Sequence, residues 1–217
     1  MPLTIHYVSV FNEEDTLIPQ SDLIDSEYVQ SKCPVHNHKQ SRTFVATSPI
    51  DFNLSINRTP NQNFISCSRP ELLEYDDEHI NSPKPVIQLV FPKFLFYTEE
   101  DNIWFEFYDH PMTALKNNFI GISGWFNLSN WSRMSSTAIT LVNEKKSVII
   151  EKGDPLFRVS FYPPNLDEGI VLKKENNREV VRQWVDAHSK ISEKDWRPRL
   201  FSKTETESKC PFSFLFK

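Results

Sequence analysis

Residues 119–164 read FIGISGWFNLSNWSRMSSTAITLVNEKKSVIIEKGDPLFRVSFYPP, and this stretch decides the class of fold. Two short runs in it, at 138–142 and 147–150, are apolar and rich in β-branched residues. A third run, at 156–162, alternates apolar and polar residues with a period of two, and turn residues around Gly153 precede it. Short apolar runs divided by turn residues are typical of antiparallel strands. The stretch therefore predicts antiparallel β structure.

Similar apolar runs occur along the rest of the chain, and polar, acidic segments at 12–31 and 69–85 predict the connections between them. Pro92 is expected to bend the strand in which it lies, because proline cannot donate a hydrogen bond within a sheet. Further strands are predicted in segments 3–11, 42–56 with a break at Ser48-Pro49, 64–68, 86–98 and 103–108.

One helix is predicted at about residues 177–190, where apolar side chains from Val180 to Ile191 recur with a spacing near 3.6. Asn176 or Asn177 can cap its start. The expected fold is therefore mainly β, an antiparallel barrel or sandwich of the cupin-like or β-clip-like kind, with this one C-terminal helix. Residues 1–217 are expected to form a single domain.

The composition restricts the kinds of molecule that the protein is expected to bind and the setting in which it is expected to act. A net charge of −5 argues against nucleic acid as the main partner. Three cysteines in 217 residues suggest reduced thiols in a cytosolic setting. No leader sequence is evident at the start, and no apolar run has the length of a membrane helix. A soluble, intracellular protein without membrane contact is expected.

The last nine residues, 209–217, form an apolar tail that includes Phe212, Phe214, Leu215 and Phe216. Four large apolar side chains at one terminus would make it adhesive if they stayed in water. The tail is therefore expected to pack on its own domain or on a neighbouring subunit.

Cys33, His36 and His38 form the one candidate metal site, since thiolate and imidazole groups are ligands for zinc or iron. On an extended segment His36 and His38 would share a face while Cys33 would lie opposite His36. The spacing matches no common closed zinc site, and a polar loop without a cofactor is the principal expectation.

A cupin-like, iron-dependent enzyme is a further alternative, with His110 as another candidate ligand. Enzymes of that kind use a histidine followed two positions later by an acidic residue. None of the six histidines has an acidic residue at that spacing, and no catalytic motif such as Gly-x-Ser-x-Gly is present. No catalytic residue is therefore predicted.

Aromatic residues supply the candidate binding residues Trp104, Trp125 and Trp131, together with Arg133. With Tyr108, these rings could stack on a sugar or a base. At alternating strand positions such rings also serve in the core, and both interpretations stay open.

The segment Ser132-Arg133-Met134-Ser135-Ser136, the strands after it and the turn at 152–157 resemble the later half of the dUTPase and dCTP-deaminase family. In that β-clip family a Ser-rich turn binds phosphate, so the resemblance implies a nucleotide-binding barrel. The glycine that precedes the arginine in the family's turn is missing here, and no segment matches its catalytic Asp strand.

A second resemblance extends over most of the chain. Lys32-Cys33-Pro34, Arg42-Thr43-Phe44-Val45 and Ser48-Pro49-Ile50-Asp51 are similar to motifs of an uncharacterised family encoded by T4-like marine cyanophages, as are three later motifs. The resemblance implies a viral origin and a site of action in the host cytoplasm during infection or in the virion. The later motifs are Phe126-Asn127 with Ser129, Trp131 and Arg133, then 152–157, and Lys209-Cys210-Pro211-Phe212.

These observations favour a non-enzymatic, phage-encoded β-domain that binds a partner protein or assembles with itself. A metal-dependent or nucleotide-binding barrel enzyme is the first alternative, and a virion component is the second.

Overall fold

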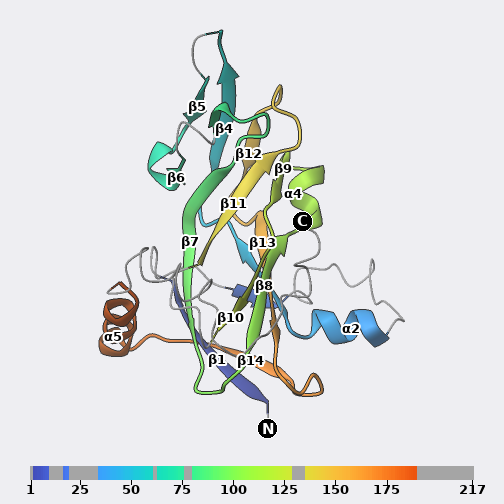
Figure 1. Cartoon of the computed structure of the whole chain (residues 1–217), viewed down its shortest axis with the longest axis vertical. Coiled ribbons are helices and arrows are strands. Elements are labelled where there is room, and N and C mark those ends of the chain that lie inside the picture. Colours follow the sequence, from blue (N-terminus) through green and yellow to red (C-terminus); the bar gives the residue numbers. More distant parts are fainter. Residues whose placement is uncertain are drawn as a thin grey trace, which may run out of the picture.

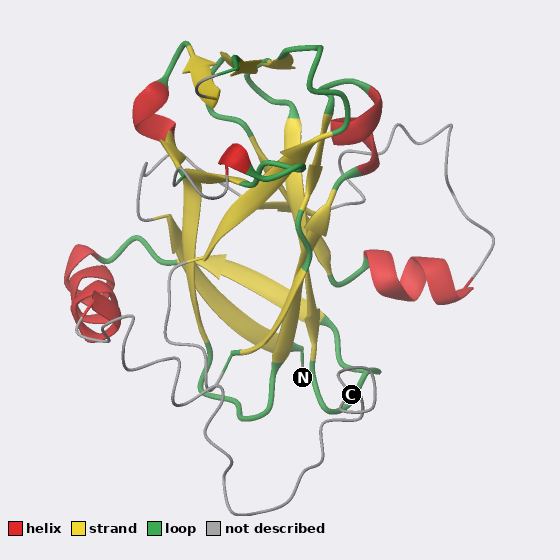
Figure 2. Ribbon diagram, turned by 45° about the horizontal axis from the view of Figure 1, so that its top comes forward, coloured by secondary structure: helices red, strands yellow, loops and turns green. Residues whose placement is uncertain are grey.

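The computed structural model describes residues 2–9, 17–19, 34–60, 63–75, 80–128 and 135–189. Within these ranges, the side chains of residues 34–36, 136 and 185–189 are not described. The strands gather in three sheets, with β4, β5 and β12 at one end of the molecule and β1 and β14 toward the other (Figure 1). The helices lie outside the sheets, and α2 and α5 are on opposite sides (Figures 1 and 2).

The largest sheet has the strand order β14-β1-β7-β11-β9, with β6 also paired to β7. The second sheet has the order β10-β8-β13-β3-β2, and the third has the order β12-β4-β5. In the first sheet the strands are β1 (Leu3–Ser9), β6 (Leu73–Glu74), β7 (Ile87–Tyr97), β9 (Phe119–Gly121), β11 (Ser135–Leu141) and β14 (Ile170–Lys174). The second holds β2 (Leu17–Pro19), β3 (Thr43–Thr47), β8 (Trp104–Asp109), β10 (Gly124–Asn127) and β13 (Pro155–Tyr162), and the third holds β4 (Phe52–Arg58), β5 (Asn63–Cys67) and β12 (Val148–Ile150).

Within the described residues, the helical elements are short apart from the last one. They are α2 (Pro34–Gln40), a 3₁₀ turn (Pro70–Leu72), α4 (Pro111–Leu115) and α5 (Arg178–Ser189). The predicted fold class is confirmed: the structure is mostly β, its sheets curl toward a barrel (Figure 2), and a helix lies near the C-terminus. The helix predicted at about 177–190 is α5.

One apolar core joins the three sheets and is dominated by phenylalanine. Ile5 and Phe94 reach it from the first sheet, Phe105 and Phe161 from the second, and Phe52 from the third. Many of these rings meet at steep angles, as in the pair Phe96–Phe161, whose centroids lie 5.2 Å apart at 74°. Edge-to-face contacts of this kind add to the stability gained from burying the rings. The abundance of Phe in the sequence is thus explained by the core.

The strands predicted from residues 119–164 exist, but they are not neighbours of one another. β11 pairs with β7, β12 pairs with β4, and β13 lies between β8 and β3. This stretch contributes β9 and β11 to the first sheet, β10 and β13 to the second and β12 to the third. The turn at Gly153 has a φ of 92°, which agrees with the demanding geometry expected there.

Pro92 lies within β7, opposite an irregular part of β11. Ser135 pairs with Phe94 and Thr137 pairs with Leu89, so more residues of β7 than of β11 separate the two pairs. Such a bulge accommodates a residue that has no N–H to donate.

Several features depart from the sequence-based expectation. The segment after Cys33 is the helix α2 and not an extended loop, and Pro34 supplies the first-turn proline that helices favour. β14 was not predicted, since its apolar run is only Ile170-Val171-Leu172. It pairs in parallel with β1, whereas the other strand pairs of the described residues are antiparallel. β2 occurs inside the segment 12–31, which was predicted to be a connection.

Candidate functional site

The outer face of the five-stranded sheet carries two exposed tryptophans, Trp104 and Trp125, together with charged and hydroxyl side chains. On β13, Phe157, Val159 and Phe161 are fully buried in the core, so Arg158 and Tyr162 point to the other face. The same alternation places Phe105 and Phe107 of β8 inward. The outward side chains of this sheet include Trp104, Glu106 and Tyr108 of β8, Arg158, Ser160 and Tyr162 of β13, Trp125 and Asn127 of β10, and Thr43 of β3.

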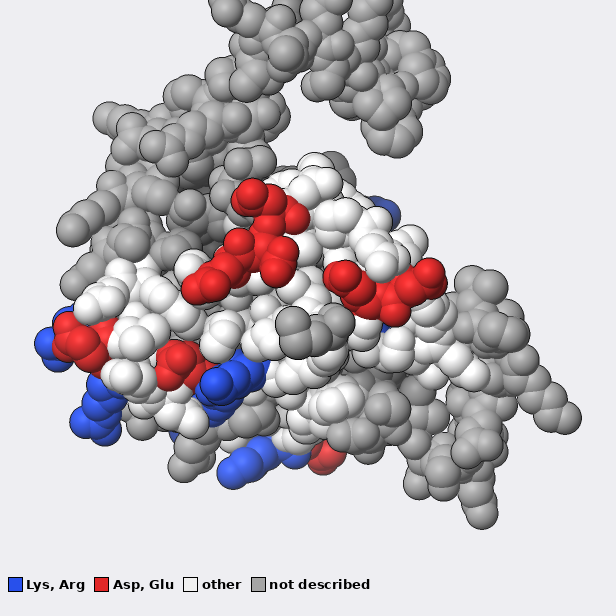
Figure 3. Space-filling model, turned by 90° about the horizontal axis from the view of Figure 1, so that it is seen from below, with Lys and Arg blue, Asp and Glu red and all other residues white. Residues whose placement is uncertain are grey.

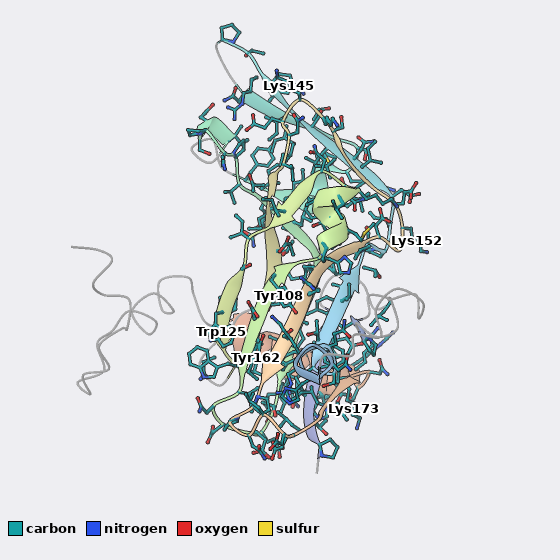
Figure 4. The ribbon with its side chains drawn as sticks, turned by 90° about the vertical axis from the view of Figure 1, so that its right-hand side faces the viewer. Tyr108, Trp125, Lys145, Lys152, Tyr162 and Lys173 are labelled. Atoms are coloured by element: carbon teal, nitrogen blue, oxygen red, sulfur yellow. The ribbon has the colours of Figure 1, made fainter. Side chains whose placement is uncertain are left out.

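The register of the strands sets these side chains in rows. Trp125 lies opposite Glu106, which lies opposite Ser160, which lies opposite Thr43. In the next row Trp104 of β8 lies between Asn127 and Tyr162. Figure 4 shows Trp125, Tyr162 and Tyr108 on neighbouring strands in the lower half of the molecule.

Three rings of this face, Trp104, Trp125 and Tyr162, form what we call the aromatic strip. The rings of Trp125 and Tyr162 are stacked, with centroids 4.7 Å apart and planes at 31°. The Trp104 ring neighbours that of Trp125, with centroids 6.2 Å apart and planes at 30°. Trp125 remains 53% exposed and Trp104 36% exposed. A large indole ring open to solvent, yet fixed against a neighbouring ring, is the kind of anchor that binding surfaces use.

Tyr162 is itself fixed by Glu106. The Tyr162 hydroxyl donates a hydrogen bond of 2.8 Å to Glu106 Oε2. Burial, together with this bond to a carboxylate, raises the pKa of Tyr162, so the hydroxyl remains a donor. Lys39 Nζ of α2 lies 3.9 Å from the same carboxylate. Glu106 contacts Tyr162, and Tyr162 contacts Trp125. The exposed indole of Trp125 is therefore connected, through Tyr162, to a charged residue of the central strands.

Next to the strip, Thr43, Tyr108 and Ser160 form a hydroxyl cluster. Ser160 Oγ lies 2.7 Å from Thr43 Oγ1 and 2.8 Å from the Tyr108 hydroxyl. All three residues are buried even though they point away from the core. α2 covers them: Thr43 Oγ1 donates to the Lys39 carbonyl at 2.8 Å, and Lys39 Nζ lies 4.8 Å from the centre of the Tyr108 ring. The cluster thus attaches α2 to the sheet.

The hydroxyl cluster does not resemble a nucleophilic site. The hydroxyl partners of Ser160 are Thr43 and Tyr108, neither of which is a general base at neutral pH. Arg158 Cζ lies 4.3 Å from the Tyr108 ring centre, and Arg158 Nε donates to the Asp109 carbonyl at 2.9 Å. These contacts hold Tyr108 in place.

The turn beside the strip is acidic. Glu99, Glu100 and Asp101 are exposed and directly precede Asn102, whose Oδ1 accepts a 3.1 Å hydrogen bond from Trp104 Nε1. The view from below shows acidic side chains on this end of the molecule, with basic side chains at several places among and around them (Figure 3). Glu106 adds a further carboxylate beside the strip, and Lys39 Nζ lies 3.9 Å from it.

The candidate metal ligands are only partly within the described residues. Cys33 lies outside them, and His36 lies in α2 with its side chain not described. The segment is helical, which corrects the extended geometry that was expected. His38 Nε2 lies 2.7 Å from the Leu166 carbonyl oxygen and 3.0 Å from Arg42 Nη2. In the described part of the chain, no three His, Cys, Asp or Glu side chains are grouped as metal ligands would be.

His110 has a structural position. Its Nδ1 accepts a hydrogen bond of 3.3 Å from the Met112 N–H, which caps the start of α4. Burial, with Arg158 nearby, lowers the pKa of His110 to about 4. The ring is therefore neutral at pH 7 and acts as an acceptor.

Of the four predicted binding residues, the structure brings Trp104 and Trp125 together, and Trp131 and Arg133 lie outside the described residues. Sequence reasoning missed Tyr162 and Glu106. The alternation of the run 156–162 places Tyr162 outward, but only the strand register shows that it meets Trp125.

The sequence matches no protein-family model and no curated protein. Among solved structures, the chain is similar to the native EIAV dUTPase, with a TM-score of 0.37 and 8% identity over 74% of this chain and 91% of that one. A similarity of this size carries no argument about activity. Within the described residues, no helix has both the length and the apolar character needed to cross a membrane.

Proposed function

We propose that this chain is a non-enzymatic binding domain that holds its partner on the outer face of the five-stranded sheet. The observation that carries the proposal is the exposure of Trp125, at 53%, on a ring that Tyr162 already holds in place at 4.7 Å. An anchor that is fixed before binding loses little conformational entropy when the partner arrives.

The polar groups of the face support binding more than catalysis. Ser160 is enclosed by hydroxyl partners, His110 caps α4, and His38 lies against Arg42 and the Leu166 carbonyl. Each of these groups has a structural partner, whereas the indoles of the strip are left open.

The resemblance to the cyanophage family suggests where the partner is found. A phage-encoded domain of this kind meets it in the host cytoplasm during infection or in the virion. The expected partner is a host or phage molecule, or a second copy of the chain.

The test is retention by immobilised protein. Wild-type protein and Trp125→Ala are coupled to beads and incubated with a clarified lysate of cyanobacterial cells. We expect wild-type beads to retain a defined component that Trp125→Ala beads lose, since an aromatic anchor of this kind contributes about 2 kcal/mol or more.

A matched control comes from the other end of the molecule. Phe64 on β5 is 48% exposed and lies outside the strip, so Phe64→Ala removes a similarly exposed ring. The Phe64→Ala beads should retain the same component as wild type. If the two variants retained equal amounts, the outer face would not be the binding site. Sedimentation of the free protein shows whether the chain associates with a second copy of itself, which distinguishes self-assembly from binding of a foreign partner.

A further inference from the structure

We infer that β5 is an interaction surface for a second copy of this chain, and that two molecules pair their β5 strands antiparallel about a twofold axis. β5 is the last strand of the third sheet, and among the described strands it pairs with β4 alone. Figure 1 shows β5 at the end of the molecule away from β10. The surface is therefore separate from the outer face of the five-stranded sheet, and the inference does not depend on the proposed function.

The hydrogen bonds between β4 and β5 show which backbone groups of β5 point outward. Ser68, directly after β5, donates its N–H to the Asn53 carbonyl oxygen at 3.0 Å. In an antiparallel pair, residues that exchange hydrogen bonds alternate with residues that do not. Counting back from Ser68, every second residue of β5 turns its N–H and C=O groups away from β4, and these groups have no hydrogen-bond partner within the described part of the chain. The residues are Asn63, Ile65 and Cys67.

β5 lacks the features that protect other end strands of these sheets. Edge strands are commonly kept from pairing with another chain by lysine, by proline or by a covering group. β14 ends in Lys173-Lys174, β2 ends in Pro19, and the Ile149 carbonyl oxygen of β12 accepts a 2.7 Å hydrogen bond from Asn117 Nδ2. β5, with the sequence NFISC, contains neither a charged residue nor a proline. Its edge can therefore accept another strand.

Charge and symmetry favour a second copy as the occupant of this edge. The arginines that flank β5 are paired within the molecule: Arg58 Nη2 lies 3.0 Å from Glu144 Oε1, and Arg69 Nη1 lies 3.7 Å from Glu71 Oε1. Because β5 itself is uncharged, two copies of it meet without a like-charge contact. A twofold pairing also uses both open edges at once, so the assembly closes at two molecules.

The outward backbone groups also set the register. When Ile65 lies opposite the partner's Ile65, Asn63 of each strand lies opposite Cys67 of the other, and every outward group is used. Sliding one strand by two residues would leave an outward residue of each strand without an opposite number. The Ile65 side chain is only partly buried against the core, and its copy would extend the apolar cover over it. On the other face, this register sets Phe64 opposite the partner's Ser66.

The experiment measures the mass of the whole chain by sedimentation equilibrium from micromolar to near-millimolar concentration. A single strand pair buries little surface, so we expect a weak association in which the average mass rises from that of one chain toward that of two. Hydrogen exchange read by NMR gives the position of the contact. Exchange of the Asn63, Ile65 and Cys67 amides should slow as the concentration rises, because these N–H groups become bonded in the pair.

Two double variants test the register at positions where the side chain points to solvent. Phe64 is 48% exposed and Ser66 is also exposed, so changes there spare the core. Phe64→Lys/Ser66→Lys sets lysine opposite lysine at two places and should weaken association by roughly tenfold. The matched variant Phe64→Lys/Ser66→Glu also lacks the Phe64 ring but sets lysine opposite glutamate, and it should associate more tightly than the first. The melting temperature of each variant shows that it is folded.

A mass of one chain at every concentration would overturn the inference. So would association of Phe64→Lys/Ser66→Lys equal to that of wild type, or equal association of the two double variants. Slow exchange of the outward amides in the monomer would show that the edge is covered by the chain itself, and would overturn it too. Trp125→Ala should associate as wild type does. These results leave the lysate test at Trp125 unaffected, because that test concerns a different surface.

Discussion

Gly153 has a backbone conformation that residues with a side chain rarely adopt. Its φ is 92°, and a Cβ placed there would meet no atom within 4 Å, so the cost of substitution comes from the backbone alone. Gly153→Ala and Gly153→Val should therefore destabilise the fold by roughly 1–3 kcal/mol in chemical denaturation.

Gly169 is the matched control for this prediction. A Cβ there would make only an ordinary contact, 3.9 Å from Pro2 Cβ, and no positive φ is recorded for it. Gly169→Ala should be neutral or slightly stabilising. Equal effects of the two alanine variants would contradict the conformational explanation.

The lowered pKa of His110 should make the stability of the fold depend on pH. Its pKa is about 4 in the folded state against 6.5 ordinarily, so the unfolded chain binds more protons between these values. The stability that the neutral ring provides is complete above about pH 6.5 and falls as the pH is lowered toward 4. His110→Asn can still cap α4. The melting temperature of this variant should change less than that of wild type between pH 6.5 and 4, and identical profiles would show that His110 is not responsible.

Single residues of the candidate site could be found from the sequence only where the residue type is itself informative. Trp104 and Trp125 were predicted because large aromatic rings in alternating runs are candidates for stacking. Glu106 and Tyr162 were not, because an acidic residue and a tyrosine gain their role here from strand register. The register depends on β8 being paired on both sides, which no local pattern reveals.

Among the elements, α5 is attached to the first sheet by Trp184. The ring of Trp184 lies 4.9 Å from that of Tyr97 on β7 and 6.0 Å from that of His6 on β1. Trp184→Ala should therefore cost about 1–2 kcal/mol of stability. Arg182→Ala is the control, since that side chain is 73% exposed and its ion pair with Glu179 is at the surface. Equal melting temperatures of the two variants would show that α5 does not depend on Trp184.

The elements that sequence patterns predict well are those with a complete apolar period. A complete apolar period is present in α5 and in the strands β1, β4, β8 and β13. α2 is only seven residues long, and its sequence, PVHNHKQ, contains one large apolar side chain. It is held by the contacts of Lys39 with the hydroxyl cluster and Glu106, which a helical period cannot show.

At the scale of the whole molecule, the class of fold followed from the sequence and the arrangement of strands did not. Apolar alternation shows that a run is a strand with one buried face. It does not show which strand lies beside it, because every apolar face here fits the same phenylalanine core. For this reason the sequence predicts β11, β12 and β13 as successive strands, although each of them belongs to a different sheet.

The expectation that the apolar tail at 209–217 packs on its own domain or on a neighbour concerns residues outside those that the structure describes, and it stays a prediction. The strip, in contrast, lies on described strands, and its exposure is a property of the folded sheet. The proposal that the outer face binds a partner can therefore be tested without knowing what the partner is.

Covalent footprinting of the tryptophans tests that proposal most directly. The protein is labelled by a reactive carbene with and without clarified cyanobacterial lysate, and the modification of each tryptophan is read by mass spectrometry. We expect labelling of Trp104 and Trp125 to fall in the lysate, while labelling of Trp184, on the α5 side, does not change. Unchanged labelling at Trp104 and Trp125, or protection at Trp184 alone, would contradict it.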